Sequence, residues 1–266
     1  MVDASLTYID RGTIRADMNF MLQSQTVASA VDPNPDAQMG EGPVYNVVID
    51  HPEATILWDS GSHPDAGNGY WPAELYAAFE HADADERDLE TALGEEGYTV
   101  DDIDAVVQTH LHLDHAGGLH HFAGTDVPIY VHKAELKFAY YSAETDFGSS
   151  AYVLDDFDHD LNWQLLHRDR ETHFEGVEFL HLPGHTPGLV GTMVHLDDAG
   201  TVILTGDEAY VEENYVGEQP MGGELLWSKR DWFDSLQWLK ELERRHDARV
   251  FCGHDPRHAE ELRSEL

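Results

Sequence analysis

The chain has 266 residues, of which 52 are acidic and only 15 are lysine or arginine, for a formal net charge of −37 at pH 7. Nucleic acids and anionic membrane surfaces attract proteins through basic patches, so this composition excludes both as expected partners. The single cysteine, Cys252, excludes an intramolecular disulfide and a thiolate-rich zinc site. Any bound metal must therefore be held by nitrogen and oxygen ligands.

The acidic residues are spread along the sequence rather than gathered in a tail, which is typical of the solvated surface of a folded protein. Like charges repel one another in dilute buffer, whereas at molar salt the Debye length falls to about 3 Å and most of the repulsion is screened. We therefore expect a halophilic protein, from a salt-adapted organism. Residues 1–20 lack the features of a signal peptide and no apolar run could span a membrane, so we also expect a cytoplasmic location.

Short apolar segments alternate with helical patterns, and no linker or composition shift divides the chain, so we expect one domain over residues 1–266. Residues 45–51 and 54–61 predict a hairpin. Residues 72–82 and 87–97 then show helical periodicity, and residues 230–247 predict the strongest amphipathic helix. Further strands are predicted over residues 105–110, 127–133, 177–184, 191–197, 201–207 and 248–254. This alternation predicts an α/β layered domain.

Four of the predicted strands end in a histidine or an aspartate, or have one directly after them. These residues are His110, His185, Asp207 and His254. In α/β layers, side chains at strand ends gather in one cleft above a rigid base. The sequence therefore predicts one metal-binding cluster.

The segment THLHLDHAGGL carries several further ligand types in a short space. If the chain stays extended after the strand, His110 and His112 point to the same side and share one ion. A turn at Asp114 would direct Asp114 and His115 to a neighbouring ion, and we expect Gly117 and Gly118 to let the backbone pass close to the metals.

Two ions resolve the crowding of these ligands. His185 can complete the first site, His254 can complete the second, and Asp207 can bridge both through its two oxygens. Two metals that share a bridging carboxylate lie close enough to activate one shared water, which predicts hydrolysis.

These motifs resemble the metallo-β-lactamase superfamily, whose H-x-H-x-D-H signature stands here at His110, His112, Asp114 and His115. The segments ILWDSG, HLPGHTPG, TGDEAYVEEN and FCGHD extend the resemblance over nearly the whole chain. Among its branches, the sequence is most similar to the N-acyl-homoserine lactonases that quench quorum sensing. The resemblance implies an αβ/βα sandwich with a dinuclear metal site at the edge of the two sheets.

The resemblance also implies a role for each site residue. His110, His112 and His185 would hold one metal, Asp114, His115 and His254 the other, and Asp207 would bridge the two. Tyr210 would donate a hydrogen bond to the substrate carbonyl or its oxyanion, in keeping with a phenol that stays protonated at neutral pH. The implied mechanism is attack of a metal-bridging hydroxide on a lactone carbonyl, with Asp114 passing the proton.

Each assignment has a structural alternative. Strand-end polar residues could cap loops, and Tyr210 could pack in a loop beside Tyr215. We expect Asp59 to be a hydrogen-bond acceptor behind the ligands or a turn former. We expect His120, His121 and His132 to lie at the surface, or in the core with their hydrogen bonds satisfied. A packing role is expected for Cys252.

The substrate is less constrained than the metal site. Residues 140–166 form an aromatic insertion that could wall an acyl-chain pocket, pack as a helical hairpin, or contact a second copy in a homodimer. A small-molecule lactone or related ester is the favoured substrate. A glyoxalase II-like thioesterase is the alternative, although its anionic glutathione substrate favours basic residues, and a non-enzymatic metal-binding domain is a third possibility.

We expect two divalent ions, with zinc favoured and manganese, iron or cobalt also suited to these ligands.

Overall fold

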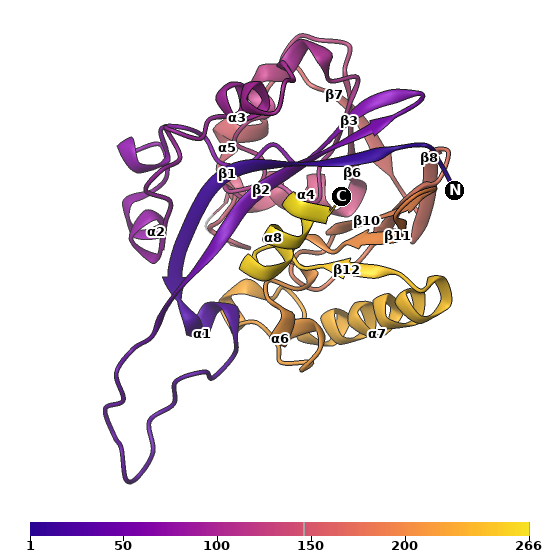
Figure 1. Ribbon diagram of the computed structural model, residues 1–266. Coiled ribbons are helices and arrows are strands. Elements are labelled where there is room, and N and C mark those ends of the chain that lie inside the picture. The colour runs from indigo at the N-terminus through magenta and orange to yellow at the C-terminus, as the bar shows by residue number, and fades with distance from the viewer. Residues whose placement is uncertain (146, 266) are drawn as a thin grey trace.

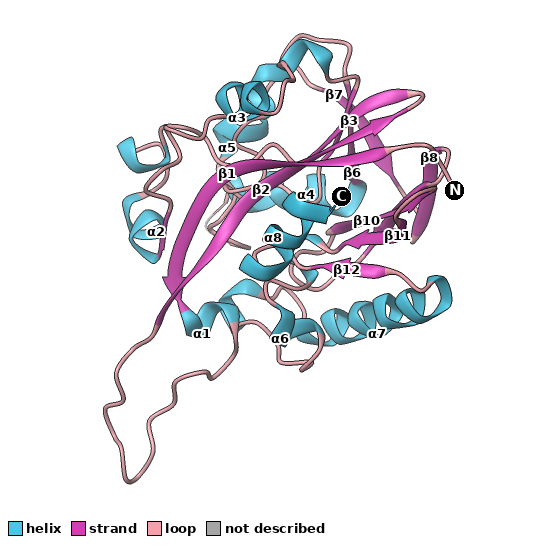
Figure 2. Cartoon of the chain, in the orientation of Figure 1, coloured by secondary structure: helices cyan, strands magenta, loops and turns pink. Residues whose placement is uncertain are grey.

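The computed structural model describes residues 1–145 and 147–265, and its strands form two sheets (Figure 1, Figure 2). Within these residues the strand order is β4-β1-β2-β3-β5-β6-β7 in the first sheet and β12-β11-β10-β9-β8 in the second. The first sheet contains β1 (Ser5–Asp17), β2 (Met39–His51), β3 (Ala54–Trp58), β4 (Phe79–Glu80), β5 (Ala105–Val107), β6 (Pro128–His132) and β7 (Asn162–Leu166). The second contains β8 (Arg170–Phe174), β9 (Val177–His181), β10 (Val190–Leu196), β11 (Gly200–Leu204) and β12 (Arg249–Phe251).

The helices vary in length from single turns to the long α7. They are α1 (Met18–Met21), α2 (Ala73–Ala78), α3 (Leu89–Glu95), α4 (Lys133–Ala143), α5 (Leu154–Phe157), α6 (Glu212–Tyr215), α7 (Lys229–His246) and α8 (Pro256–Glu265). Short 3₁₀ turns lie at Ala66–Asn68, Val100–Asp102, Leu119–Phe122, Gly206–Glu208 and Gly223–Leu225. Among the described residues no helix is both long and apolar enough to cross a membrane.

The sheets pack face to face, and helices cover both outer faces. In β2, Val47 and Ile49 face the core between the sheets, whereas Val48 faces the core under α3 and α4. This alternation follows from the two-residue period of a strand. On the second sheet, Met193 and Ile203 pack against the apolar stripe of α7. The order helix, sheet, sheet, helix confirms the predicted αβ/βα sandwich.

The predicted hairpin is confirmed by the pairing of β2 with β3 from Val47↔Trp58 to His51↔Ala54. The predicted helix over residues 230–247 is confirmed as α7, which begins after the N-cap Ser228 and ends at His246, before the C-cap Asp247. The helix predicted over residues 72–82 is partly wrong, because the chain leaves α2 at Phe79 to pair with β1 as β4. Strands β1, β7 and β8 and the first half of β2 were not predicted.

The loop over residues 22–38, which follows α1 and precedes β2, projects away from the body of the protein (Figure 1). Val27 and Val31 are 63% and 94% exposed on it.

The segment over residues 140–166 is not a helical hairpin. It contains the end of α4, the single turn α5 and the edge strand β7, which pairs in parallel with β6. Asp146, within this segment, lies outside the described residues.

Candidate metal centre

The strands deliver the candidate ligands to the edge at which the two sheets meet. In the first sheet, β5 ends at Val107 and His110 follows three residues later. In the second sheet, β11 ends at Leu204 before Asp207, and β12 ends at Phe251 before His254. The fourth strand, β9, is followed by the loop that carries His185. Strand-end loops from both layers therefore converge on one cluster, as the sequence predicted.

The first group consists of three buried histidines. His185 Nε2 lies 3.2 Å from His110 Nε2 and 2.9 Å from His112 Nδ1. Asp207 Oδ2 faces this group, 3.3 Å from His185 Nε2 and 3.6 Å from His110 Nε2. Two neutral imidazole nitrogens can share such a distance only if a proton or a cation lies between them.

The second group lies on the other side of Asp207. Asp114 Oδ2 is 3.6 Å from His115 Nε2 and 3.8 Å from His254 Nε2. Asp207 Oδ1 lies 3.3 Å from His115 Nε2 and 3.2 Å from His254 Nε2. Because each oxygen of Asp207 faces a different group, its carboxylate can contact two ions at once. The structure thus brings all seven predicted ligands together.

The cluster has the unpartnered polar atoms and the donor separations that a pair of divalent ions requires. His115 Nε2, His254 Nε2 and both carboxylate oxygens of Asp207 are buried without a hydrogen-bond partner among the described residues. Buried polar atoms without partners are rare in native proteins, unless an ion or water satisfies them. Donor atoms around a tetrahedral zinc ion lie about 3.3 Å apart, and the separations here run from 2.9 to 3.8 Å.

The protonation states of His110, His112 and Asp207 suit metal ligation. Burial lowers the pKa of His110 and of His112 well below the usual value, so both imidazoles are neutral at pH 7. Burial alone would raise the pKa of Asp207, but His115 and His254 beside it hold that pKa well below its usual range. Neutral imidazole and ionised carboxylate are the forms that bind metals. Burial alone would lower the pKa of His115 and of His254, but the charge of Asp207 raises both, so these two imidazoles release a proton when an ion binds.

The outward nitrogens of the ligand histidines are hydrogen-bonded. Asp59 Oδ2 lies 2.8 Å from His115 Nδ1, and Asp59 Oδ1 accepts a hydrogen bond of 2.7 Å from the Thr109 N–H. His185 Nδ1 and His254 Nδ1 lie 2.6 and 2.9 Å from backbone carbonyl oxygens. Such contacts leave the Nε2 atoms free to face a metal. Asp59 is also the turn former that the sequence suggested, with a φ of 58°.

Tyr210 lies between the two groups. Its ring centroid is 4.8 Å from that of His254 and 5.7 Å from that of His185, and the residue is 8% exposed. Burial, together with the charge of Asp207, raises the pKa of the phenol well above its usual value. The hydroxyl therefore remains a hydrogen-bond donor across the physiological pH range.

Residues 39–254 match the family model described as the metallo-beta-lactamase superfamily. The chain belongs to this superfamily. It is 30% identical over 259 residues to the N-acyl homoserine lactonase AiiB of Agrobacterium fabrum, covering 94% of this chain and 93% of that protein. It is 32% identical over 241 residues to an N-acyl homoserine lactonase of a Bacillus species, with 88% and 89% covered.

The fold of this superfamily member is also similar to a solved structure of an N-acyl homoserine lactone hydrolase with the product N-hexanoyl-L-homoserine at its catalytic metal centre. The TM-score is 0.83 and the identity is 25%, over 98% of this chain and 96% of that one. The similarity therefore covers the complete site as well as the sandwich.

One buried carboxylate of this metallo-β-lactamase fold was missed by sequence reasoning. Glu135 of α4 accepts hydrogen bonds from the Leu111 N–H (3.0 Å), the Tyr152 hydroxyl (2.8 Å) and the Thr186 hydroxyl (2.6 Å). It therefore ties the segment between His110 and His112 to the residue after His185. The signal in the sequence was helical spacing, since Glu135 shares the buried face of α4 with Ala139 and Ser142.

The two motif glycines pack closely against the loop that precedes the motif. A Cβ on Gly117 would collide with the backbone of Ser62 and His63, and one on Gly118 would collide with the Ser60 carbonyl oxygen. These glycines let the motif pack against residues 60–63, and their expected role beside the metals stays a prediction.

The residues that were expected to lie outside the site do so. His120 Nδ1 lies 2.9 Å from the Gly117 carbonyl oxygen, and His121 lies beside Glu90. His132 caps α4 and stacks on His181. Cys252 is buried in the core under α7.

Cavities open along the cluster. One of about 330 Å³ is bordered by His112, His185, Phe138, Ser149 and Trp227, among others. Two narrower cavities, of about 30 and 20 Å³, share Asp114 and Tyr210 in their walls and are otherwise mostly apolar. A substrate in this cleft would contact both groups of ligands.

Proposed function

We propose that this protein is a dinuclear metallohydrolase that opens the ring of N-acyl homoserine lactones or related lactones. The observation that carries the proposal is the phenol of Tyr210 beside a seven-ligand cluster, in a chain that is 30% identical to a lactonase over nearly its whole length. The superfamily fold alone would support a hydrolase without specifying a lactone.

In this proposal His110, His112 and His185 would hold one ion, Asp114, His115 and His254 would hold the other, and the carboxylate of Asp207 would contribute to both sites. When bound, such ions lower the pKa of a coordinated water and polarise a carbonyl group. Zinc fits the nitrogen and oxygen donors, and manganese, iron and cobalt accept the same ligand types.

The chain's own side chains supply the remaining chemistry. A water oxygen bonds to the lactone carbonyl carbon and the ring C–O bond breaks, which gives an alcohol and a carboxylic acid, and the acid releases its proton to solvent to become a carboxylate. Tyr210 donates a hydrogen bond to the carbonyl oxygen as negative charge develops there. Asp114, which lines both narrow cavities beside Tyr210, takes the proton from the water and returns it to the leaving oxygen.

The insertion over residues 140–166 contributes a wall of the acyl pocket in this proposal. Gly148 and Ser149 border the cavity of about 330 Å³ together with Phe138 and Trp227. The ring of Tyr152 lies 4.5 Å from that of His112, between centroids. Apolar and aromatic walls suit an alkyl chain. The homodimer stays a prediction.

A glyoxalase II-like thioesterase is less well supported. No described lysine or arginine lines any of the three cavities at the cluster. A glutathione thioester carries carboxylates, which would lie beside Glu224 and Asp114 without a cation to pair with.

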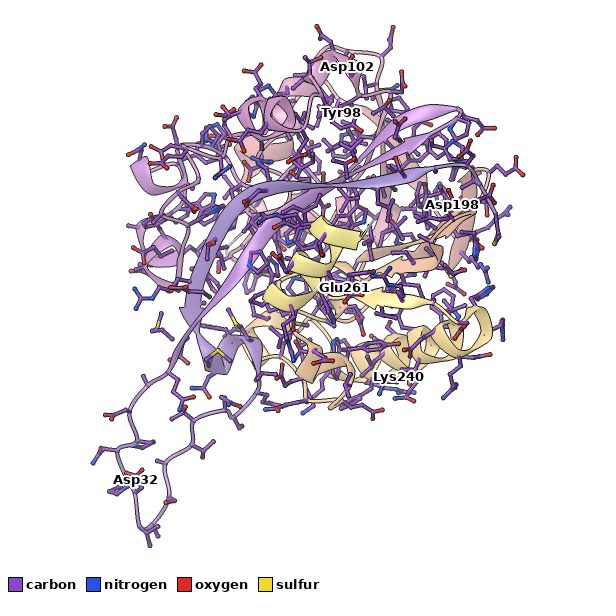
Figure 3. All side chains as sticks on the ribbon, in the orientation of Figure 1. Asp32, Tyr98, Asp102, Asp198, Lys240 and Glu261 are labelled. Carbon is purple, nitrogen blue, oxygen red and sulfur yellow. The ribbon has the colours of Figure 1, made fainter. Side chains whose placement is uncertain are left out.

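We also propose that the acidic surface is an adaptation to high salt. Figure 3 shows carboxylate groups around the whole outline of the protein, and Asp32, Asp102, Asp198 and Glu261 are labelled on separate segments. With a net charge of −37, self-repulsion in dilute buffer opposes folding.

Hydrolysis of three substrates in molar potassium chloride tests the function. We expect N-hexanoyl homoserine lactone to be turned over with a kcat/KM at least about 100-fold above that for S-lactoylglutathione or nitrocefin, because the proposed pocket fits the lactone and not the other two substrates. Preference for S-lactoylglutathione would replace the lactonase proposal with the thioesterase.

A further inference from the structure

Arg11, in β1, is a buried cation that no carboxylate accompanies among its hydrogen-bond acceptors. The residue is 1% exposed. Its guanidinium donates to the carbonyl oxygens of Arg87 (2.7 Å), Ser60 and Ser62 (3.0 Å), and to Asn46 Oδ1 (2.7 Å). Burial lowers its pKa to about 10, so it remains charged at neutral pH. Asp88 lies near enough to interact with this charge, but the four hydrogen-bond acceptors named above are all neutral. A buried charge held in this way is expensive, which points to a structural role for its hydrogen bonds.

Two of these hydrogen bonds hold the loop over residues 59–62, and a third reaches Asn46 on strand β2. The carbonyl oxygens on either side of Gly61 both point at the guanidinium. Gly61 has a φ of 72°, and a Cβ there would collide with Arg11 Nη1. The loop therefore wraps around the guanidinium, and glycine is needed at its centre.

This loop in turn is hydrogen-bonded to the motif around His115. The Ser60 N–H and the Ser60 hydroxyl both donate to the His115 carbonyl oxygen, at 2.9 Å each. The Gly117 N–H donates to the Gly61 carbonyl oxygen at 2.7 Å. Asp59, at the start of the loop, lies 2.8 Å from His115 Nδ1. Position and ring orientation of His115 thus both depend on the loop that Arg11 organises.

The first group of ligands is supported by a different residue. Glu135, on α4, holds Leu111 and Thr186, which are chain neighbours of His110, His112 and His185. Arg11 and Glu135, on separate elements, therefore each support mainly one half of the cluster. Thr109 links the halves, because it donates to Asp59 and its hydroxyl lies 3.0 Å from His110 Nδ1.

We propose that Arg11 is a positioning residue for the second metal site, the half built from Asp114, His115 and His254. Loss of its guanidinium weakens metal binding at that half and leaves the half built from His110, His112 and His185 unchanged. The inference rests on the proposed ligand assignment, and it concerns metal affinity rather than turnover.

The test measures zinc affinity by chelator competition in two single-site backgrounds. His112→Ala disables the first half, so zinc then reports on the second, and His254→Ala does the reverse. Adding Arg11→Met should weaken zinc binding about 10-fold to 100-fold in the His112→Ala background. In the His254→Ala background it should change binding less than about twofold, because Glu135 and its contacts are untouched.

Matched variants guard against a general loss of folding. Glu135→Gln should show the opposite selectivity, and Arg11→Lys, which keeps the charge but donates fewer hydrogen bonds, should weaken the second half less than Arg11→Met does. If Arg11→Met does not fold, the selectivity of Arg11→Lys decides. Equal weakening in both backgrounds, or none in either, would overturn the proposal. If the ligand assignment itself were wrong, His112→Ala and His254→Ala would not each remove one zinc ion, which is seen before Arg11 is changed.

Discussion

The ring of Tyr210 stands nearly perpendicular to that of His254, at 88° with centroids 4.8 Å apart. This contact holds the phenol beside the group that contains Asp114, and Tyr210 lines both narrow cavities of the cleft. A rigidly held donor of this kind stabilises charge without reorganising during the reaction.

Tyr210→Phe tests that role. We expect kcat for an N-acyl homoserine lactone to fall about 10-fold to 1,000-fold, because one donor to the developing oxyanion is lost. Metal content, measured by inductively coupled plasma mass spectrometry, should stay the same because no ligand changes. The matched control is Tyr215→Phe, which removes a hydroxyl bonded to Glu243 away from the cluster. Parental kcat and KM in Tyr210→Phe would leave the tyrosine with packing alone.

Salt should stabilise the protein. The expected result is a melting temperature that rises steadily from dilute buffer to molar potassium chloride, because screening relieves repulsion within a surface of net charge −37. Sucrose at matched osmolality is the control, since it stabilises folded proteins without screening charge. An equal rise with sucrose, or none with salt, would speak against salt adaptation.

Asp156 should make stability fall as the pH rises. Burial raises its pKa to about 8, although Oδ1 accepts a hydrogen bond from the Tyr70 hydroxyl. The unfolded chain releases this proton near pH ~4 and the folded chain only near its higher pKa, so folding loses stability between the two values. Asp156→Asn removes this penalty and keeps an acceptor for Tyr70.

The measurement is the free energy of unfolding by urea at several pH values. The difference between Asp156→Asn and the parent should increase in favour of the variant from about pH 4 to about pH 8. Asp155→Asn, at the exposed neighbouring position, is the control and should show no such trend. A difference that is constant with pH would mean that Asp156 ionises normally.

The seven candidate ligands could be predicted from the sequence because each follows a strand rich in β-branched residues or lies in one short motif. Strand β1 was not, because Arg11 and other polar residues interrupt its alternation. Phe79 continues a helical pattern, yet pairing with Ala16 draws it into a strand. The hydrogen bonds of Arg11 and Glu135 join residues 17 to 76 positions apart. Local sequence patterns do not indicate such contacts, so the residues that support the cluster could be identified only from the structure.

The seven-ligand cluster is proposed to be a dinuclear centre at which a lactone is hydrolysed. The direct measurement is proton release from N-hexanoyl homoserine lactone while zinc is titrated into metal-free protein in molar potassium chloride. We predict no turnover without metal and a rise that levels off at two equivalents of zinc per chain, whereas Asp207→Ala, which lacks the carboxylate facing both groups, should stay nearly inactive. Full turnover at one equivalent, or in the metal-free protein, would contradict it.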